Sequence, residues 1–115
     1  MRNIIKIKEK NNQLYFANKY TPIICGNTNY YLEFDFNEKW LLSKNKLAII
    51  DILGKRYFYY FDKNILKLPY IKNCPYFLLA LIYSPNSDEI YTTNTLKFNL
   101  EQNIFYDEFS DYFKF

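Results

Sequence analysis

The side chains in this sequence that could do chemistry are carboxylates, because the other usual catalytic groups are missing. The 115-residue chain has no histidine and only two glycines, Gly26 and Gly54. It therefore contains no Ser-His-Asp or Cys-His pair and no phosphate-binding loop of the G-x-G-x-x-G or Walker A type. Glu33 and Asp35 alternate along an expected strand at about 7 Å, a spacing compatible with a carboxylate-pair hydrolase. Any strand with one solvent-exposed face can show this pattern, so the pair is weak evidence for catalysis. Since the other usual catalytic groups are missing, the sequence predicts a protein that is not an enzyme and binds no cofactor.

The two cysteines are the remaining candidates for metal binding. Cys25 and Cys74 lie far apart in the sequence, without C-x-x-C spacing and without a histidine to complete a ligand set. The sequence therefore predicts no metal site. Their apolar neighbours favour two buried thiols, with a disulfide between them as the alternative.

A basic and aromatic segment raises the question of nucleic-acid binding. Lys55 and Arg56 precede an unbroken aromatic run over residues 57–61, and rings on a strand beside cations can stack single-stranded bases. In that case Lys55 and Arg56 would meet phosphate, and Tyr57 and Tyr59 would stack. The aromatic run lacks the small residues that let bases approach. The net charge of the chain, +3, is also far below that of proteins whose affinity comes from neutralising phosphates. Nucleic acid is thus disfavoured as a partner, and Tyr57 and Tyr59 are kept as candidates for binding a protein.

The tyrosine content favours protein binding more generally. The chain has 13 Tyr and 11 Phe, and a domain of this size cannot bury every ring with its hydroxyl satisfied. Exposed tyrosines suit protein interfaces, where a rigid ring provides contact area at small entropic cost. A protein-binding module therefore follows more readily than an enzyme.

The C-terminal segment combines apolar and acidic residues. Residues 1–46 contain eight basic and four acidic side chains, whereas residues 88–115 contain two basic and six acidic ones. Over residues 101–115 the apolar positions recur at intervals of one, three and four, which predicts a short amphipathic helix. This helix either covers an open end of the domain or docks into a groove of a partner. Its candidate partner-binding residues are Tyr106, Asp107, Glu108, Asp111 and Tyr112.

The elements that must position all of these residues are strands. Apolar residues alternate with polar ones over 29–36 and 95–100, and the apolar run 76–83 is typical of a central strand covered on both faces. Gly54 separates two strand-like runs and predicts a hairpin. Further strands are expected over residues 4–8, 14–16, 66–68 and 89–92. Seven to nine short strands without helical crossovers predict an all-β, antiparallel sandwich or barrel.

One domain over residues 1–100, followed by the helix of residues 101–115, is the expected organisation, because no linker or internal repeat divides the chain. The N-terminus has no apolar stretch of the length of a secretory signal. The longest apolar run is too short for a membrane-spanning helix. The sequence therefore predicts a protein that contacts no membrane and stays in the cytoplasm.

Several short motifs resemble a domain family of tailed phages, namely the N-terminal domains of baseplate and tail-fibre proteins. The likeness covers about residues 1–100. It begins at Gly26-Asn27-Thr28, continues through the alternating strand to Trp40, and is followed by a Lys-rich segment. The motifs are 26–30, 33–40, 43–46, 68–69, 76–83 and 92–96.

The resemblance implies an immunoglobulin-like β-sandwich with Trp40 as a core anchor. It also implies a module that attaches an appendage to the phage tail, assembling symmetrically with itself or with tail proteins. Such a protein would be located in the cytoplasm of an infected or lysogenic bacterium and finally in the virion tail. The chain departs from the family in having few loop glycines and no fibre extension. Because of these departures, a second hypothesis stays open. In it, the chain is a small phage inhibitor of a host defence nuclease complex, of the kind that anti-CRISPR proteins represent. It would act through the acidic C-terminal residues.

Overall fold

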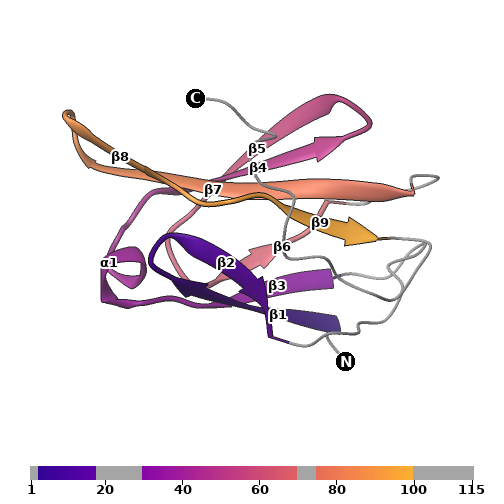
Figure 1. Cartoon of the computed structure of the whole chain (residues 1–115), viewed down its shortest axis with the longest axis horizontal. Coiled ribbons are helices and arrows are strands. Elements are labelled where there is room, and N and C mark those ends of the chain that lie inside the picture. Colours follow the sequence, from indigo (N-terminus) through magenta and orange to yellow (C-terminus); the bar gives the residue numbers. More distant parts are fainter. Residues whose placement is uncertain (1–2, 18–29, 70–74, 100–115) are drawn as a thin grey trace.

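The computed structural model describes residues 3–17, 30–69 and 75–99, which form nine strands and a one-turn helix (Figure 1). The strand number and the all-β class predicted from the sequence are confirmed for this part of the chain. In chain order the elements are β1 (Asn3–Lys10), β2 (Gln13–Phe16), β3 (Tyr30–Asp35), α1 (Glu38–Leu41), β4 (Lys46–Ile52), β5 (Lys55–Phe61), β6 (Ile65–Lys67), β7 (Tyr76–Asn86), β8 (Glu89–Thr92) and β9 (Leu96–Asn99).

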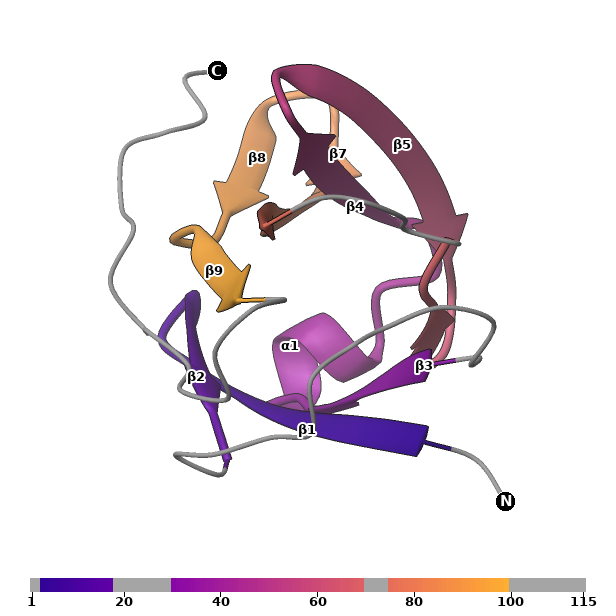
Figure 2. The same cartoon turned by 90° about the vertical axis from the view of Figure 1, so that its right-hand side faces the viewer.

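The strands form two sheets that face each other, as Figures 1 and 2 show from two directions. One sheet has the order β2-β1-β3-β6, and the other has the order β5-β4-β7-β8, with β9 also paired to β7. The main core fills the space between them, as expected of a β-sandwich. Its buried residues include Ile7, Leu14, Leu32, Phe34, Ile50, Leu66, Phe77, Leu79, Leu81 and Phe98.

The prediction that the sandwich is entirely antiparallel is wrong for one pair of strands. β1 and β3 run parallel, in a register that places Asn3 opposite Tyr30 and Lys8 opposite Asp35. A parallel pair needs a crossover of about a dozen residues or more, and the chain between β2 and β3 supplies residues 17–29. Alternation of apolar residues is the same for both strand directions, so the sequence pattern could not distinguish them.

The predicted hairpin at Gly54 is confirmed between β4 and β5. Leu53 and Gly54 have φ angles of 53° and 83°, which are the two consecutive positive values of the tight turn that suits hairpin twist. The Gly54 N–H donates to Oδ1 of Asp51 at 2.9 Å, which holds the turn from within β4.

The predicted central strand is also confirmed, because β7 pairs with β4 on one side and with β8 and β9 on the other. Phe77, Leu79 and Leu81 face the main core, and Leu78 and Ala80 face the outside of the sandwich. All five are at most 1% exposed. The strand therefore carries apolar residues on both sides, as its unbroken run predicted.

The helix α1 closes one end of the space between the sheets (Figures 1 and 2) and was not expected from the sequence. Asn37 caps it, with its side chain accepting from the Trp40 N–H at 3.2 Å. Trp40 is fully buried in the main core, which agrees with the position that the resemblance implied for it.

Some of the sequence-based predictions fall on residues outside the described ranges. These are the C-terminal helix over residues 101–115 and the state of Cys25 and Cys74. Within the ranges that the structure describes, no helix is long and apolar enough to span a membrane.

Candidate functional site

The outer face of the four-stranded sheet is charged and solvated. Glu33 and Asp35 point outward from β3, and the register places them opposite Lys6 and Lys8 of β1. Opposite charges on facing positions of neighbouring strands stabilise a sheet. The two carboxylates that could have formed a hydrolase site lie next to lysines and line a hollow of about 290 Å³ together with them. The expectation that this pair is not catalytic stays a prediction.

The outer face of the five-stranded sheet is apolar, in contrast. Its centre consists of Ile49, Leu78 and Ala80, which are buried, surrounded by half-buried Leu47, Tyr76 and Ile82. On β5 the same face carries Phe58 and Tyr60, opposite Ile49 and Leu47 in the register. We call these eight residues the apolar face. A sheet face of this composition is typical of an interface rather than of a surface that meets water.

The strand β5 is the edge of this sheet and the most exposed aromatic element of the structure. It pairs with β4, and no described strand pairs with its other side. Phe58 is 58% exposed and Tyr60 is 74% exposed. Proteins usually protect an edge strand with charges, proline or a bulge, whereas the charges of β5 lie at its start, in Lys55 and Arg56. We call Phe58, Tyr60 and this open edge the β5 surface.

Tyr57 and Tyr59, the binding candidates from the sequence, lie on the opposite side of β5. They pair with Ile50 and Ala48, which face the core, and both tyrosines are half-buried. Tyr59 packs against the main core. Successive side chains of a strand point to opposite faces, so the rings of either residues 57, 59 and 61 or residues 58 and 60 had to lie in the core. The sequence could not distinguish the two faces, because both are aromatic. The binding role of Tyr57 and Tyr59 stays a prediction.

The other sequence candidates are in the C-terminal segment. Tyr106, Asp107, Glu108, Asp111 and Tyr112 lie outside the residues that the structure describes. Their role as partner-binding residues also stays a prediction.

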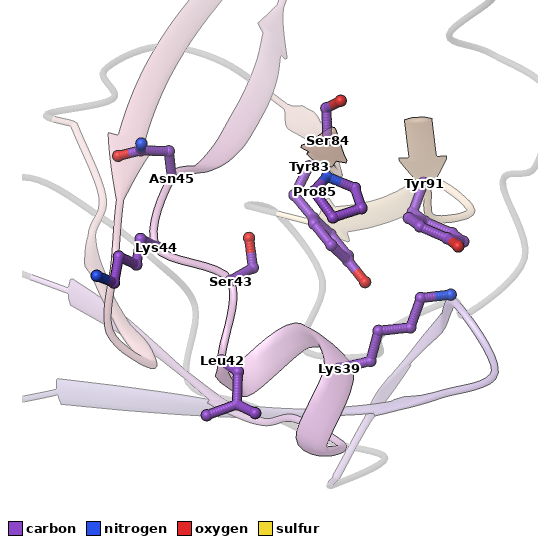
Figure 3. Close-up of a pocket in the computed structure, with 9 residues that line it drawn as sticks. All are labelled: Lys39, Leu42, Ser43, Lys44, Asn45, Tyr83, Ser84, Pro85 and Tyr91. Carbon is purple, nitrogen blue, oxygen red and sulfur yellow. The ribbon is translucent and has the colours of Figure 1, made fainter. Parts of the chain in front are cut away.

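A hollow of about 480 Å³ lies between the loop after α1 and the end of β7 (Figure 3). Tyr83 and Tyr91 form one wall, with their rings stacked at 5.2 Å, and Lys39 Nζ lies 3.1 Å from the centroid of the Tyr91 ring. In Figure 3 the side chains of Lys44 and Asn45 point away from Tyr83. The Lys39 side chain, in contrast, extends toward Tyr91.

Tyr83 has an unusual environment. It is 3% exposed, and its buried hydroxyl has no hydrogen-bond partner among the residues that the structure describes. Burial, helped by the nearby Tyr91, Glu9 and Glu89, raises the pKa of Tyr83 from 10.0 to about 12. The folded protein therefore resists ionisation of this phenol more than the unfolded chain does.

We expect Tyr83→Phe to leave stability at pH 7 unchanged or to raise it by up to about 1 kcal/mol, because the substitution removes a buried hydroxyl that has no described partner and keeps the ring. Since the pKa of Tyr83 is raised on folding, its contribution to stability is present below pH 10 and is lost as pH rises toward 12. Urea denaturation between pH 7 and pH 11.5 should therefore show wild type losing more stability than Tyr83→Phe above pH 10. Equal losses in the two proteins would contradict this assignment.

The chain was compared with models of protein families, with characterised proteins and with solved structures. None of the three comparisons finds a match. The function is therefore inferred from the fold, the two sheet faces and the motifs in the sequence.

Proposed function

We propose that this chain is a non-enzymatic, phage- or prophage-encoded protein-binding module that attaches to its partner through the β5 surface. In this proposal it is a baseplate or tail-fibre accessory domain with an immunoglobulin-like sandwich. The observation that supports it best is the open edge of β5, where Phe58 and Tyr60 are largely exposed.

Strand addition is the binding mode that this edge favours. An extended segment of a partner adds to an open edge through main-chain hydrogen bonds, and alternate side chains provide specificity. The seven residues of β5 offer an edge without proline or glycine. Phe58 and Tyr60 project beside it, and aromatic residues are enriched in protein interfaces. Their exposure in this chain supports a hot spot for a partner rather than a role in folding.

The choice of a phage tail protein as the partner is supported by the resemblance of residues 26–40 and of the later motifs to the tail domain family. The complete burial of Trp40 is compatible with its role as a core anchor in that family. Such a module would be made in the cytoplasm of the infected or lysogenic bacterium and built into the tail. The inhibitor hypothesis relies on acidic residues outside the described ranges, so no observation on the structure favours it.

The test is capture of tail proteins by the tagged chain from the bacterium that carries its phage or prophage. We expect Phe58→Lys and Tyr60→Lys each to reduce recovery of tail or baseplate proteins at least about tenfold, the loss of one hot spot of about 1.4 kcal/mol. A lysine at an open edge also opposes strand addition. The matched control is Tyr15→Lys, because Tyr15 is 43% exposed on β2, an edge strand of the other sheet.

The control should recover wild-type amounts of the partner. Unchanged recovery with both β5 variants, at native thermal stability, would show that the β5 surface is not the attachment site. Recovery of a host nuclease complex in place of tail proteins would instead support the inhibitor hypothesis.

A further inference from the structure

The segment formed by β5 and the residue after it is nearly symmetric in its chemistry. Its two ends carry opposite charges, Arg56 and Asp62. Phe58 and Tyr60 lie between them, each two residues from the nearer charge. All four side chains are exposed, and within the described residues β5 pairs only with β4. Two such segments placed antiparallel therefore bring unlike charges together and rings next to rings.

We propose that the open β5 edges of two copies of this chain pair antiparallel, about a twofold axis at Tyr59, and join two five-stranded sheets into one. In this register Phe58 lies opposite Tyr60 of the second copy. Arg56 lies opposite Asp62 of the second copy. The twofold axis repeats both contacts, as an interface between identical chains requires.

The positions of the rings and charges select this register over its neighbours. A shift of one residue would place Phe58 opposite a side chain of the other sheet face, because successive side chains alternate. A shift of two residues keeps the faces but separates the charges, since either Arg56 or Asp62 then lies opposite an aromatic ring. Opposite charges at facing positions stabilise an antiparallel pair. The register about Tyr59 is therefore the favoured one.

Both charges also have neighbours within their own chain. Arg56 lies opposite Asp51 of β4. A guanidinium has five donors in a planar fork, so it can bind a carboxylate on each side. Asp62 lies beside the buried Lys46, whose Nζ donates to the Asp62 carbonyl oxygen at 2.8 Å. This bond fixes the end of β5, where the Arg56 side chain of the second copy would arrive.

The extent of the contact predicts a weak dimer. The chain bends over residues 62–64 toward β6 of the other sheet, so Lys63 does not continue the ladder to meet Lys55 of the second copy. Each copy contributes one strand edge and two rings, of Phe58 and Tyr60, and an aromatic side chain buries about 150–250 Å². An interface of about 1,000 Å² is at the small end of specific ones. We therefore expect a reversible dimer.

This inference rests on the proposed function in one respect, that the β5 surface is an attachment site. It adds that a second copy occupies this surface before a tail protein does. The rings of Phe58 and Tyr60 are then covered in the free protein, and a tail protein binds by replacing the second copy.

Sedimentation velocity of the purified chain between about 1 and 200 µM tests the proposal. We expect the wild type to pass from monomer to dimer in this range. Tyr60→Lys should weaken the dimer at least about tenfold, because a lysine at a strand edge opposes pairing. The control Tyr15→Lys, on an edge of the other sheet, should dimerise like the wild type. A wild type that stays monomeric, or a dimer that Tyr60→Lys leaves unchanged, would overturn the proposal.

Two charge-reversal variants, Arg56→Glu and Asp62→Lys, test the register. Each alone places like charges opposite each other and should weaken self-association at least about tenfold. Mixed in equal amounts, they place a glutamate opposite a lysine and Arg56 opposite Asp62. The mixture should therefore form a heterodimer within about threefold of the wild-type affinity. A mixture that stays monomeric would contradict the register and with it the proposal.

Circular dichroism shows whether Arg56→Glu folds next to Asp51. If it does not, disulfide formation in a mixture of Phe58→Cys and Tyr60→Cys chains decides. Facing residues of an antiparallel pair lie about 5.5 Å apart at Cα, within the reach of a disulfide. Crosslinking that is faster in the mixture than in either variant alone supports the proposal, and equal or slower crosslinking overturns it.

The inference and the proposed function can fail separately. Self-association is measured on the purified chain, whereas attachment is measured by the recovery of tail proteins. A chain that dimerises as expected but recovers no tail protein keeps this inference and loses the proposed function. A chain that recovers tail proteins through the β5 surface but stays monomeric does the reverse.

Discussion

Replacing Trp40 by alanine is expected to lower the free energy of unfolding by about 3–5 kcal/mol. The side chain is fully buried and connects α1 to both sheets. Its ring stacks on Phe36 at 5.8 Å and meets Tyr83 edge-on at 4.4 Å. Its Nε1–H donates to Oδ1 of Asn12 at 2.8 Å, in the turn between β1 and β2. Alanine would leave a cavity where these contacts meet and would leave Asn12 without its donor.

Urea denaturation followed by far-ultraviolet circular dichroism measures this loss without relying on tryptophan fluorescence. A matched control is Leu42→Ala, because Leu42 directly follows α1 and is 69% exposed. Its substitution should change stability by no more than about 0.5 kcal/mol. Trp40→Phe should cost less than Trp40→Ala, since much of the ring packing is kept. Equal stability of Trp40→Ala and Leu42→Ala would show that Trp40 is not the core anchor.

The second large effect is expected for Glu9→Ala, which should lower the free energy of unfolding by about 2–4 kcal/mol. Glu9 is 6% exposed and is the shared acceptor for two segments far apart in the sequence. Its carboxylate accepts from the Asn12 N–H at 3.0 Å, from the Asn37 N–H at 2.9 Å and from Asn37 Nδ2 at 3.2 Å. Alanine would leave these part-buried donors without a partner, and hydrogen bonds to a charged group are the stronger ones.

Thermal and urea denaturation at pH 7 should place Glu9→Gln between wild type and Glu9→Ala, because its amide retains one acceptor oxygen and replaces the other by a donor. The control is Glu38→Ala. Glu38 is an exposed carboxylate in the first turn of α1 and should contribute at most about 1 kcal/mol through its position there. A loss of stability in Glu9→Ala that is smaller than the loss in Glu38→Ala would contradict a role for Glu9 in joining α1 to β1.

The burial of Lys46 could not be predicted from the neighbouring residues in the sequence. Lys46 belongs to the Lys-rich segment of residues 43–46, yet its side chain is fully buried. Its Nζ donates to the carbonyl oxygens of Ser43 at 2.7 Å and Asp62 at 2.8 Å. Burial lowers the pKa of Lys46, and the nearby Asp62 carboxylate opposes that shift. These partners come together only when β4 and the end of β5 are paired.

The sequence by itself determined which residues face inward in a strand that alternates apolar and polar side chains, such as β3, because alternation is a local property of the backbone. The pattern in β3 and β7 and the turn at Gly54 follow from neighbouring residues alone, and the structure confirms all three. The sheet class follows in the same way, since many short strands without helices between them must pair with one another.

Only the tertiary structure decided the parallel pairing of β1 with β3, the burial of Glu9 beside α1, and which rings of β5 remain exposed. Strand direction and neighbours depend on contacts between residues far apart in the chain, and a one-residue slip exchanges the two faces of a strand. Where both faces of a strand are aromatic, as in β5, the sequence carries no signal to distinguish core from surface. That choice is made by the sheet that covers one face, which is why Tyr59 packs inward and Tyr60 does not.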